Sequence, residues 1–161
     1  GFTDNNNPDL ASLTNCTGYN NAQLDVKKHN FSVYRATTDI KLTNCLSYSL
    51  NADPNGGMDR FNGTSSNVAY NANATVANSV LGYNNAYYKI TNSKITASAE
   101  VATNGSAITV SDSDFQSVTL PYTDLQNVHE EMRNADGSIK LNGFLQPKTG
   151  SAIEGIGAKF N

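Results

Sequence analysis

Hydrophobic and polar positions alternate over several short segments of this chain, and this alternation predicts β-strands. The first such segments are residues 31–34 and 39–42, and the alternation continues through Leu50. Residues 51–57 contain Asp-Pro and Asn-Gly turn signals, which end this first half of the chain. Residues 1–22 show no period and many turn-forming residues, so we expect an irregular arm there.

Further strand candidates follow at intervals of about ten residues, a rhythm typical of an antiparallel barrel or sandwich. The clearest is 94–102, where Ile95, Ala97 and Ala99 alternate with polar residues. One short amphipathic helix is expected over 123–133, because its start has capping-box spacing and its apolar residues recur at helical intervals. The strand candidates are residues 67–70, 75–81, 86–91, 94–102, 107–111, 115–120, 139–145 and 152–160.

These elements predict a mostly β protein in two parts. Residues 1–57 would form a small β-rich N-terminal handle or ligand-binding part, and residues 58–161 an antiparallel eight-stranded β-barrel with the one short helix. Closing a sheet into a barrel removes exposed strand edges, which suits a protein that works outside the cell.

Composition narrows the function classes. The 161 residues include 11 basic and 14 acidic side chains, a net charge of −3, and the basic residues are scattered. Nucleic acid is therefore not expected as a partner, and no apolar run is long enough to span a membrane. The 23 asparagines, with many Ser and Thr, indicate a surface of small uncharged polar groups and are typical of a secreted protein.

Two cysteines, Cys16 and Cys45, lie in Asn/Thr-rich segments. An even cysteine count in a chain of secreted composition favours one disulfide between them, and two buried free thiols are the alternative.

Catalysis has no sequence support. The chain lacks a Gly-x-Ser-x-Gly motif, has only two histidines, and shows no zinc-ligand spacing, so we expect no enzyme and no structural metal. His29, beside the aromatic-rich segment 31–34, could stand at the mouth of an apolar heme slot, and His129 is the second candidate. For each of them an ordinary hydrogen-bonded histidine is the simpler interpretation.

Tyrosines form the other candidate binding set. Tyr83, Tyr87 and Tyr88 surround an Asn-Asn pair, a mixture that protein-binding loops favour. Tyr87 and Tyr88 are adjacent, so in a strand they point to opposite faces, and core packing is the alternative for one of them.

The C-terminal segment 137–160 carries Gly143-Phe144, Pro147, Glu154-Gly155 and Gly157-Ala158-Lys159 in that order. It resembles the closing hairpin of the C-terminal β-barrel family that includes transferrin-binding protein B, complement factor H-binding protein and the hemophilins. The resemblance implies a secreted or surface-exposed binder of a Gram-negative bacterium, exported through an outer-membrane translocon, with host proteins or heme as partners. The absence of a lipid-bearing cysteine at position 1 favours either a released, hemophilin-like form or a trimmed N-terminus.

We therefore expect a non-catalytic binding protein. Heme capture through His29 is the sharpest version of this hypothesis. A host-protein or host-surface adhesin and a carbohydrate-binding or pilus-type sandwich are the alternatives.

Overall fold

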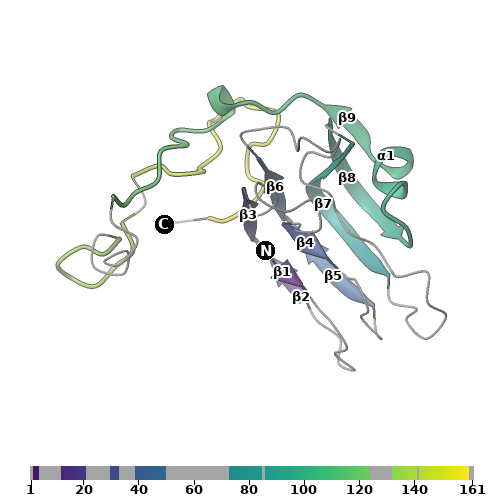
Figure 1. Ribbon diagram of the computed structural model, residues 1–161, viewed down its shortest axis with the longest axis horizontal. Helices are drawn as coiled ribbons and strands as arrows, with labels where there is room; N and C mark the ends of the chain where they lie inside the picture. Colours follow the sequence, from purple (N-terminus) through teal and green to yellow (C-terminus); the bar gives the residue numbers. More distant parts are fainter. Residues whose placement is uncertain are drawn as a thin grey trace.

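The computed structural model describes residues 2–3, 12–20, 30–32, 39–49, 73–84, 86–123, 132–140 and 142–159. Its main feature is one seven-stranded sheet that is mostly parallel (Figure 1). The described strands are β1 (Phe2–Thr3), β2 (Ser12–Thr14), β3 (Thr17–Tyr19), β4 (Phe31–Ser32), β5 (Ile40–Thr43), β6 (Leu46–Tyr48), β7 (Ala74–Tyr83), β8 (Ala86–Ile95) and β9 (Ser106–Ile108).

Parallel pairing follows a constant offset along the chain. Each of β1, β2 and β3 pairs with β4, β5 and β6 respectively, and every pair joins residues 29 positions apart, as Ser12 with Lys41 and Thr17 with Leu46. β7 then pairs with both β5 and β6 at an offset of 34, as Lys41 with Thr75. One offset shared by several strands means that the described strands of successive turns stack in register, the arrangement of a parallel β-solenoid.

Asparagines occupy the corner of each turn, between β2 and β3, between β5 and β6, and within β7. Asn15, Asn44 and Asn78 all adopt positive φ angles, of 54°, 56° and 43°. Asparagine is one of the few side chains that tolerates this left-handed conformation, which lets the chain turn from β2 to β3 and from β5 to β6. The Asn44 amide Nδ2 donates to Asn15 Oδ1 at 2.6 Å, and Asn78 Nδ2 donates to Asn44 Oδ1 at 3.0 Å. These bonds link the three turns at the corner.

The interior of the solenoid is apolar because alternate side chains of each strand point inward. On β5 the exposure pattern alternates strictly, with Ile40 and Leu42 buried and the residues after them exposed. Ten buried residues form this interior core: Phe31, Ile40, Leu42, Cys45, Ala74, Val76, Leu81, Ile90, Ile95 and Val101.

A second core lies between the sheet and the C-terminal segment. Tyr48 of β6 contacts Phe115 with ring centroids 4.7 Å apart, and its hydroxyl donates to the Asp112 carboxylate. The backbone N–H of Gly157 donates to Asn44 O at 2.9 Å, which ties the segment to the central corner. The buried residues of this core are Leu46, Tyr48, Val80, Tyr87, Phe115, Leu145, Ile153 and Ile156.

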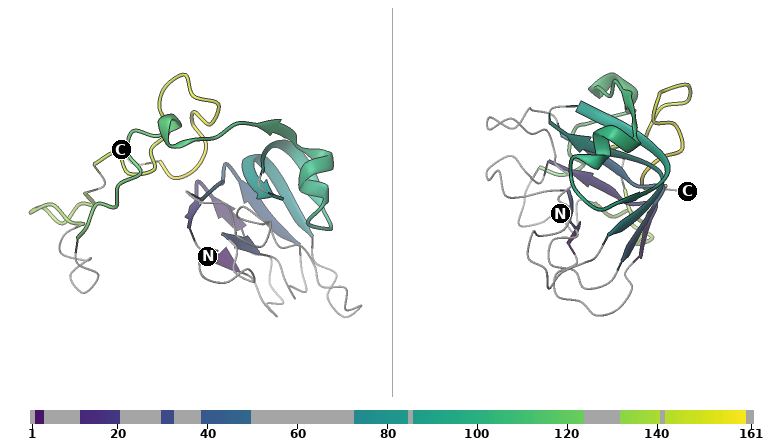
Figure 2. Two further views of the ribbon diagram at one scale, coloured as in Figure 1. Left: turned by 45° about the horizontal axis from the view of Figure 1, so that its top comes forward. Right: turned by 90° about the vertical axis from the view of Figure 1, so that its right-hand side faces the viewer.

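Beyond β7 the sheet changes character. β8 and β9 add to it in antiparallel fashion, and helix α1 (Glu100–Asn104) lies beside them with Val101 buried in the interior core (Figures 1 and 2). After β9 comes a single 3-10 turn, η1 (Asp112–Asp114), and the chain then runs away from the sheet on the side of β3 (Figure 1). Among the described helices, none is long and apolar enough to cross a bilayer.

The predicted antiparallel eight-stranded barrel is wrong. The sheet does not close, and its pairing is parallel among β2, β3, β5, β6 and β7. Alternation along a segment identifies a strand but not the direction of its neighbour, and the 29-residue offset, which sets that direction here, was not recognised. The expected irregular arm over residues 1–22 contains β1, β2 and β3 instead.

Most strands predicted for the C-terminal part are absent, because turns interrupt the described segments. Among the described residues, segments 115–120, 139–145 and 152–160 form only isolated bridges and turns, with positive φ at Asn142, Leu145 and several glycines. The clearest predicted strand, 94–102, ends at Ile95 and gives way to α1. Most of the helix expected over 123–133, and the strand expected over 67–70, lie outside the described residues.

Candidate functional site

The outer surface of the sheet is the most regular polar feature of the described chain. Because Leu42 and Val76 point inward, their neighbours Lys41, Thr43 and Thr75 point outward. The parallel register then places outward residues of successive strands side by side, about 4.8 Å apart.

Two rows result, and we call them together the polar face. The first row runs across β2, β5, β7 and β8 and consists of Ser12, Lys41, Thr75 and Lys94. The second row crosses the same strands two residues further along β2, β5 and β7 and consists of Thr14, Thr43, Ala77 and Asn92. All are exposed except Thr75 and Ala77, which are half-buried. The polar face thus offers hydroxyl, amide and ammonium groups in a flat array.

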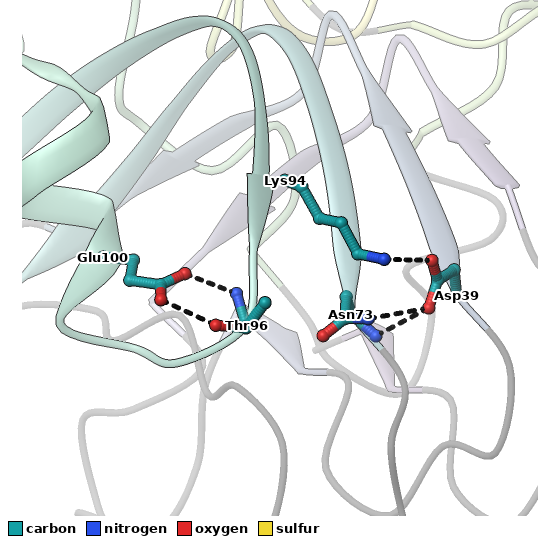
Figure 3. Close-up of polar contacts among 5 residues, drawn as sticks. All are labelled: Asp39, Asn73, Lys94, Thr96 and Glu100. Atoms are coloured by element: carbon teal, nitrogen blue, oxygen red, sulfur yellow. Dashed lines mark hydrogen bonds and ion pairs between the residues drawn. The ribbon is translucent and has the colours of Figure 1, made fainter.

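One end of the first row is fixed by an ion pair. Lys94 Nζ lies 3.1 Å from Asp39 Oδ2, and the other carboxylate oxygen accepts hydrogen bonds from the backbone and side-chain nitrogens of Asn73, at 3.1 and 3.0 Å (Figure 3). Burial opposes ionisation of Asp39, but these contacts outweigh it and lower the pKa of that carboxyl. Asp39 therefore stays charged and orients Lys94 at the start of β5 and β7.

Lys41 differs from Lys94 in its surroundings. Within the described part of the chain the Lys94–Asp39 contact is the one ion pair, so no described carboxylate neutralises the exposed Lys41. The centre of the first row therefore carries a positive charge among hydroxyl groups, with no carboxylate of the described residues paired to it.

Glu100 explains why β8 ends where it does. Its carboxylate accepts hydrogen bonds from the Thr96 backbone N–H and hydroxyl, both at 2.6 Å (Figure 3). These two bonds lower the pKa of Glu100 and hold a turn between β8 and α1, where the sequence pattern predicted a continuing strand.

The three candidate tyrosines are placed in or against the cores. Tyr87 is buried, and its hydroxyl accepts from Ser49 N at 2.9 Å and donates to Ser49 O at 3.2 Å. Tyr83 and Tyr88 are half-buried against the interior core. Their use in partner binding stays a prediction without a common exposed surface to support it.

The candidate heme ligands His29 and His129 lie outside the described residues. Within those that are described, no group of three or more His, Cys, Asp or Glu side chains could hold a metal ion.

Cys16 and Cys45 occupy equivalent positions, one residue after the corner asparagine, on stacked turns. Both are free thiols, so the expected disulfide is not present. Burial raises the pKa of the Cys45 thiol to about 11. Its sulfur points towards the carbonyl oxygens of Leu13 and Thr43, at 3.4 and 3.5 Å.

Sequence reasoning missed the polar face, although a signal for it exists. The motif Leu-Thr-Asn-Cys occurs at residues 13–16 and again at 42–45, and Val-Ala-Asn-Ser follows at 76–79. Aligning these three motifs reproduces the register of β2, β5 and β7 and brings the two rows together.

The geometry defines the class of this protein as a stacked, parallel β-solenoid with an asparagine corner. Comparison with known proteins adds nothing more specific: no protein-family model, no curated protein and no solved structure matches the chain.

Proposed function

We propose that the polar face binds an extended carbohydrate chain and that the protein acts as a non-catalytic binding module. The observation that carries this proposal is the in-register array of hydroxyl, amide and ammonium groups on four neighbouring strands. Sugar hydroxyls both donate and accept hydrogen bonds, and each of these side chains can meet them. Stacked solenoid turns present an extended surface, which suits a linear polymer.

Lys41 and Thr43 lie at the centre of the array and contribute most in this proposal. Lys41 has three donors that no described carboxylate engages, and the Thr43 hydroxyl can donate and accept. Lys94, held by Asp39, sets the edge of the binding surface.

The proposed absence of catalysis rests on the chemistry of the face itself. The described carboxylate that contacts the face is Asp39, which is engaged by Lys94 and Asn73 and has a lowered pKa, so it is poorly suited to act as a general acid. A location outside the cell is part of the proposal and is supported by the Asn/Ser/Thr-rich composition. The heme and host-protein hypotheses gain no observation from the described residues.

The test is binding to soluble polysaccharides by affinity electrophoresis, with hydroxyethyl cellulose, galactomannan and alginate as probes. Thr43→Val keeps the β-branched shape and removes the hydroxyl, and Lys41→Ala removes the ammonium. Each is expected to weaken binding of the retained probe about three- to tenfold, the equivalent of one lost hydrogen bond. Lys140→Ala removes an exposed lysine from the C-terminal segment and serves as the matched control. Equal retardation of all variants, or no retardation by any probe, would contradict the proposal.

A further inference from the structure

The two ends of the solenoid are finished differently. At one end β8 and β9 turn the sheet antiparallel, and α1 inserts the fully buried Val101 into the interior core. At the other end β2 and β3 stand at the two limits of the parallel strand order, and β1 pairs only with β4 among the described strands. No described strand pairs with the outer side of β2 or β3, and we call the surface formed by β1, β2, β3 and Asn15 the open edge. An unprotected strand edge is a template for pairing with another chain.

The corner hydrogen bonds give this edge a direction. Asn78 donates to Asn44, and Asn44 donates to Asn15, so both of these hydrogen bonds run towards the open edge. Asn15 Oδ1 is used by Asn44, while Asn15 Nδ2 is exposed and has no acceptor in the described part of the chain. The series therefore ends on a hydrogen-bond donor.

An aromatic stack ends at the same edge. The ring of Tyr19 in β3 lies parallel to that of Tyr48 in the next turn, with centroids 6.1 Å apart and planes inclined by 18°. Tyr19 is half-buried, and Phe144 of the C-terminal segment packs against it edge to face, with ring centroids 5.6 Å apart.

The C-terminal segment runs past this edge. Figures 1 and 2 show it extending on the side of β3 that faces away from β7, β8 and β9. Its apolar side chains Leu120 and Ile139 are 45% and 55% exposed, and they are the large hydrophobic residues most accessible in the described chain. An additional layer on the open edge would lie alongside this segment.

We propose that the open edge binds one further parallel solenoid turn, supplied by a polypeptide segment outside residues 1–161, with an asparagine side chain accepting from Asn15 Nδ2. The occupant continues an interface that the structure already contains twice, between the first and second turns and between the second and third. It adds backbone pairing to β2 and β3 and extends the series of corner amides.

A second copy of this chain fits the edge less well. A two-fold dimer would bring two Asn15 donors face to face, with no acceptor between them. A head-to-tail arrangement would have to pair the open edge with β8 and β9, whose antiparallel hairpin does not offer a matching parallel turn.

The experiment extends the chain by one turn of its own sequence. Inserting a second copy of residues 2–30 ahead of Phe2 preserves the 29-residue offset and places an asparagine over Asn15. Hydrogen exchange by NMR is then measured on the original β2 and β3. We expect amide protection there to rise about tenfold or more, because their open side gains backbone partners.

The variant Asn15→Asp tests the contribution of the Asn15 Nδ2 donor alone. It keeps the oxygen that accepts from Asn44 and tolerates positive φ, but replaces the outward donor by a second acceptor. It should abolish the protection gain in the extended chain and leave β5 protection unchanged. Asn78→Asp removes a donor at the far end of the series and should leave the gain intact.

Unchanged exchange in β2 and β3 of a folded extended chain would overturn the proposal. If the extended chain does not fold, a peptide with the sequence of residues 12–19 is titrated into the labelled unextended protein. Chemical-shift changes confined to β2 and β3 then support binding at the open edge. The absence of any such change overturns the proposal. Sedimentation equilibrium of the unextended protein should give a monomer, and a dimer with β2 and β3 already protected would assign the edge to a second copy.

Discussion

The side-chain amide of Asn44 donates to Asn15 in the preceding turn at 2.6 Å and accepts from Asn78 in the following turn at 3.0 Å. Asn44 is only 8% exposed and has a positive φ of 56°. One residue therefore makes the corner of its own turn and joins the turns on either side.

Replacing Asn44 tests the corner directly. Asn44→Ala removes both hydrogen bonds and places an alanine in a left-handed conformation, so we expect a loss of about 2–4 kcal/mol in unfolding free energy. Asn44→Gly removes the same bonds without the conformational penalty and should cost about 1 kcal/mol less. Urea denaturation measures both, and equal stability of the two variants and the natural protein would contradict the role of the corner.

Gly157 should be intolerant of any side chain. Its φ is +93°, and an added Cβ would lie 2.5 Å from Thr17 Oγ1 and 2.9 Å from Leu46 Cβ. Gly157→Ala is therefore expected to release the C-terminal segment from β6 and lower the thermal midpoint by several degrees, since about 1 kcal/mol shifts it by about 2–8 °C. Gly150→Ala is the matched control, because φ there is +82° and nothing lies within 4 Å of the added carbon. A similar fall in the thermal midpoint of both variants would show that backbone strain, and not the contacts of the added carbon with Thr17 and Leu46, causes the loss.

The Tyr48–Asp112 contact predicts an alkaline limit to stability. Burial, and then the Asp112 carboxylate that accepts from its hydroxyl, raise the pKa of Tyr48 above the ordinary value of 10.0. A raised pKa means that the folded state favours the protonated phenol. Its stabilising contribution is present below about pH 10 and is lost as the pH rises towards the folded-state pKa.

Tyr48→Phe should therefore flatten the loss of stability above pH 10. It should also cost about 1 kcal/mol at neutral pH, the value of one hydrogen bond. Urea midpoints between pH 7 and pH 11 measure both effects. Parallel curves for the two proteins across this range would show that Tyr48 does not set the alkaline limit.

The two thiols should react at different rates. Cys16 is half-buried, whereas burial raises the pKa of Cys45 to about 11, which leaves little thiolate at neutral pH. Iodoacetamide labelling followed by peptide mass spectrometry should modify Cys16 first, and the denatured protein should show two free thiols. If the denatured protein has no free thiol, Cys16 and Cys45 form the disulfide that the sequence suggested, and the expectation of two free thiols is contradicted.

Several strands could be predicted from the sequence because their alternation is local. The predicted segments 75–81 and 86–91 fall within β7 and β8, and 39–42 overlaps β5. The direction and partner of each strand could not be predicted from alternation, since a strand with one buried face looks the same in a parallel and an antiparallel sheet. The polar face depends on this register and was missed with it.

Side-chain contacts with the backbone explain the remaining errors. Alternation predicted a strand through residue 102, but the Glu100 carboxylate binds Thr96 and makes a turn more stable. Tyr87 was a surface candidate because it belongs to a Tyr/Asn cluster, yet its hydroxyl finds buried partners in Ser49. The Tyr87 contact could not be predicted, because the fold brings together residues 38 positions apart. The Glu100 contact is local, four residues from Thr96, but the alternation of apolar and polar positions does not reveal it.

The central claim, that the polar face is the binding surface, is tested most directly by NMR titration. Uniformly ¹⁵N-labelled protein is titrated with whichever soluble polysaccharide retards it in affinity electrophoresis. We expect saturable amide shifts centred on Lys41, Thr43 and Thr75, spreading to Thr14 and Asn92 along the two rows. Shifts centred instead on residues 83–88, or scattered over the surface without saturation, would contradict the claim.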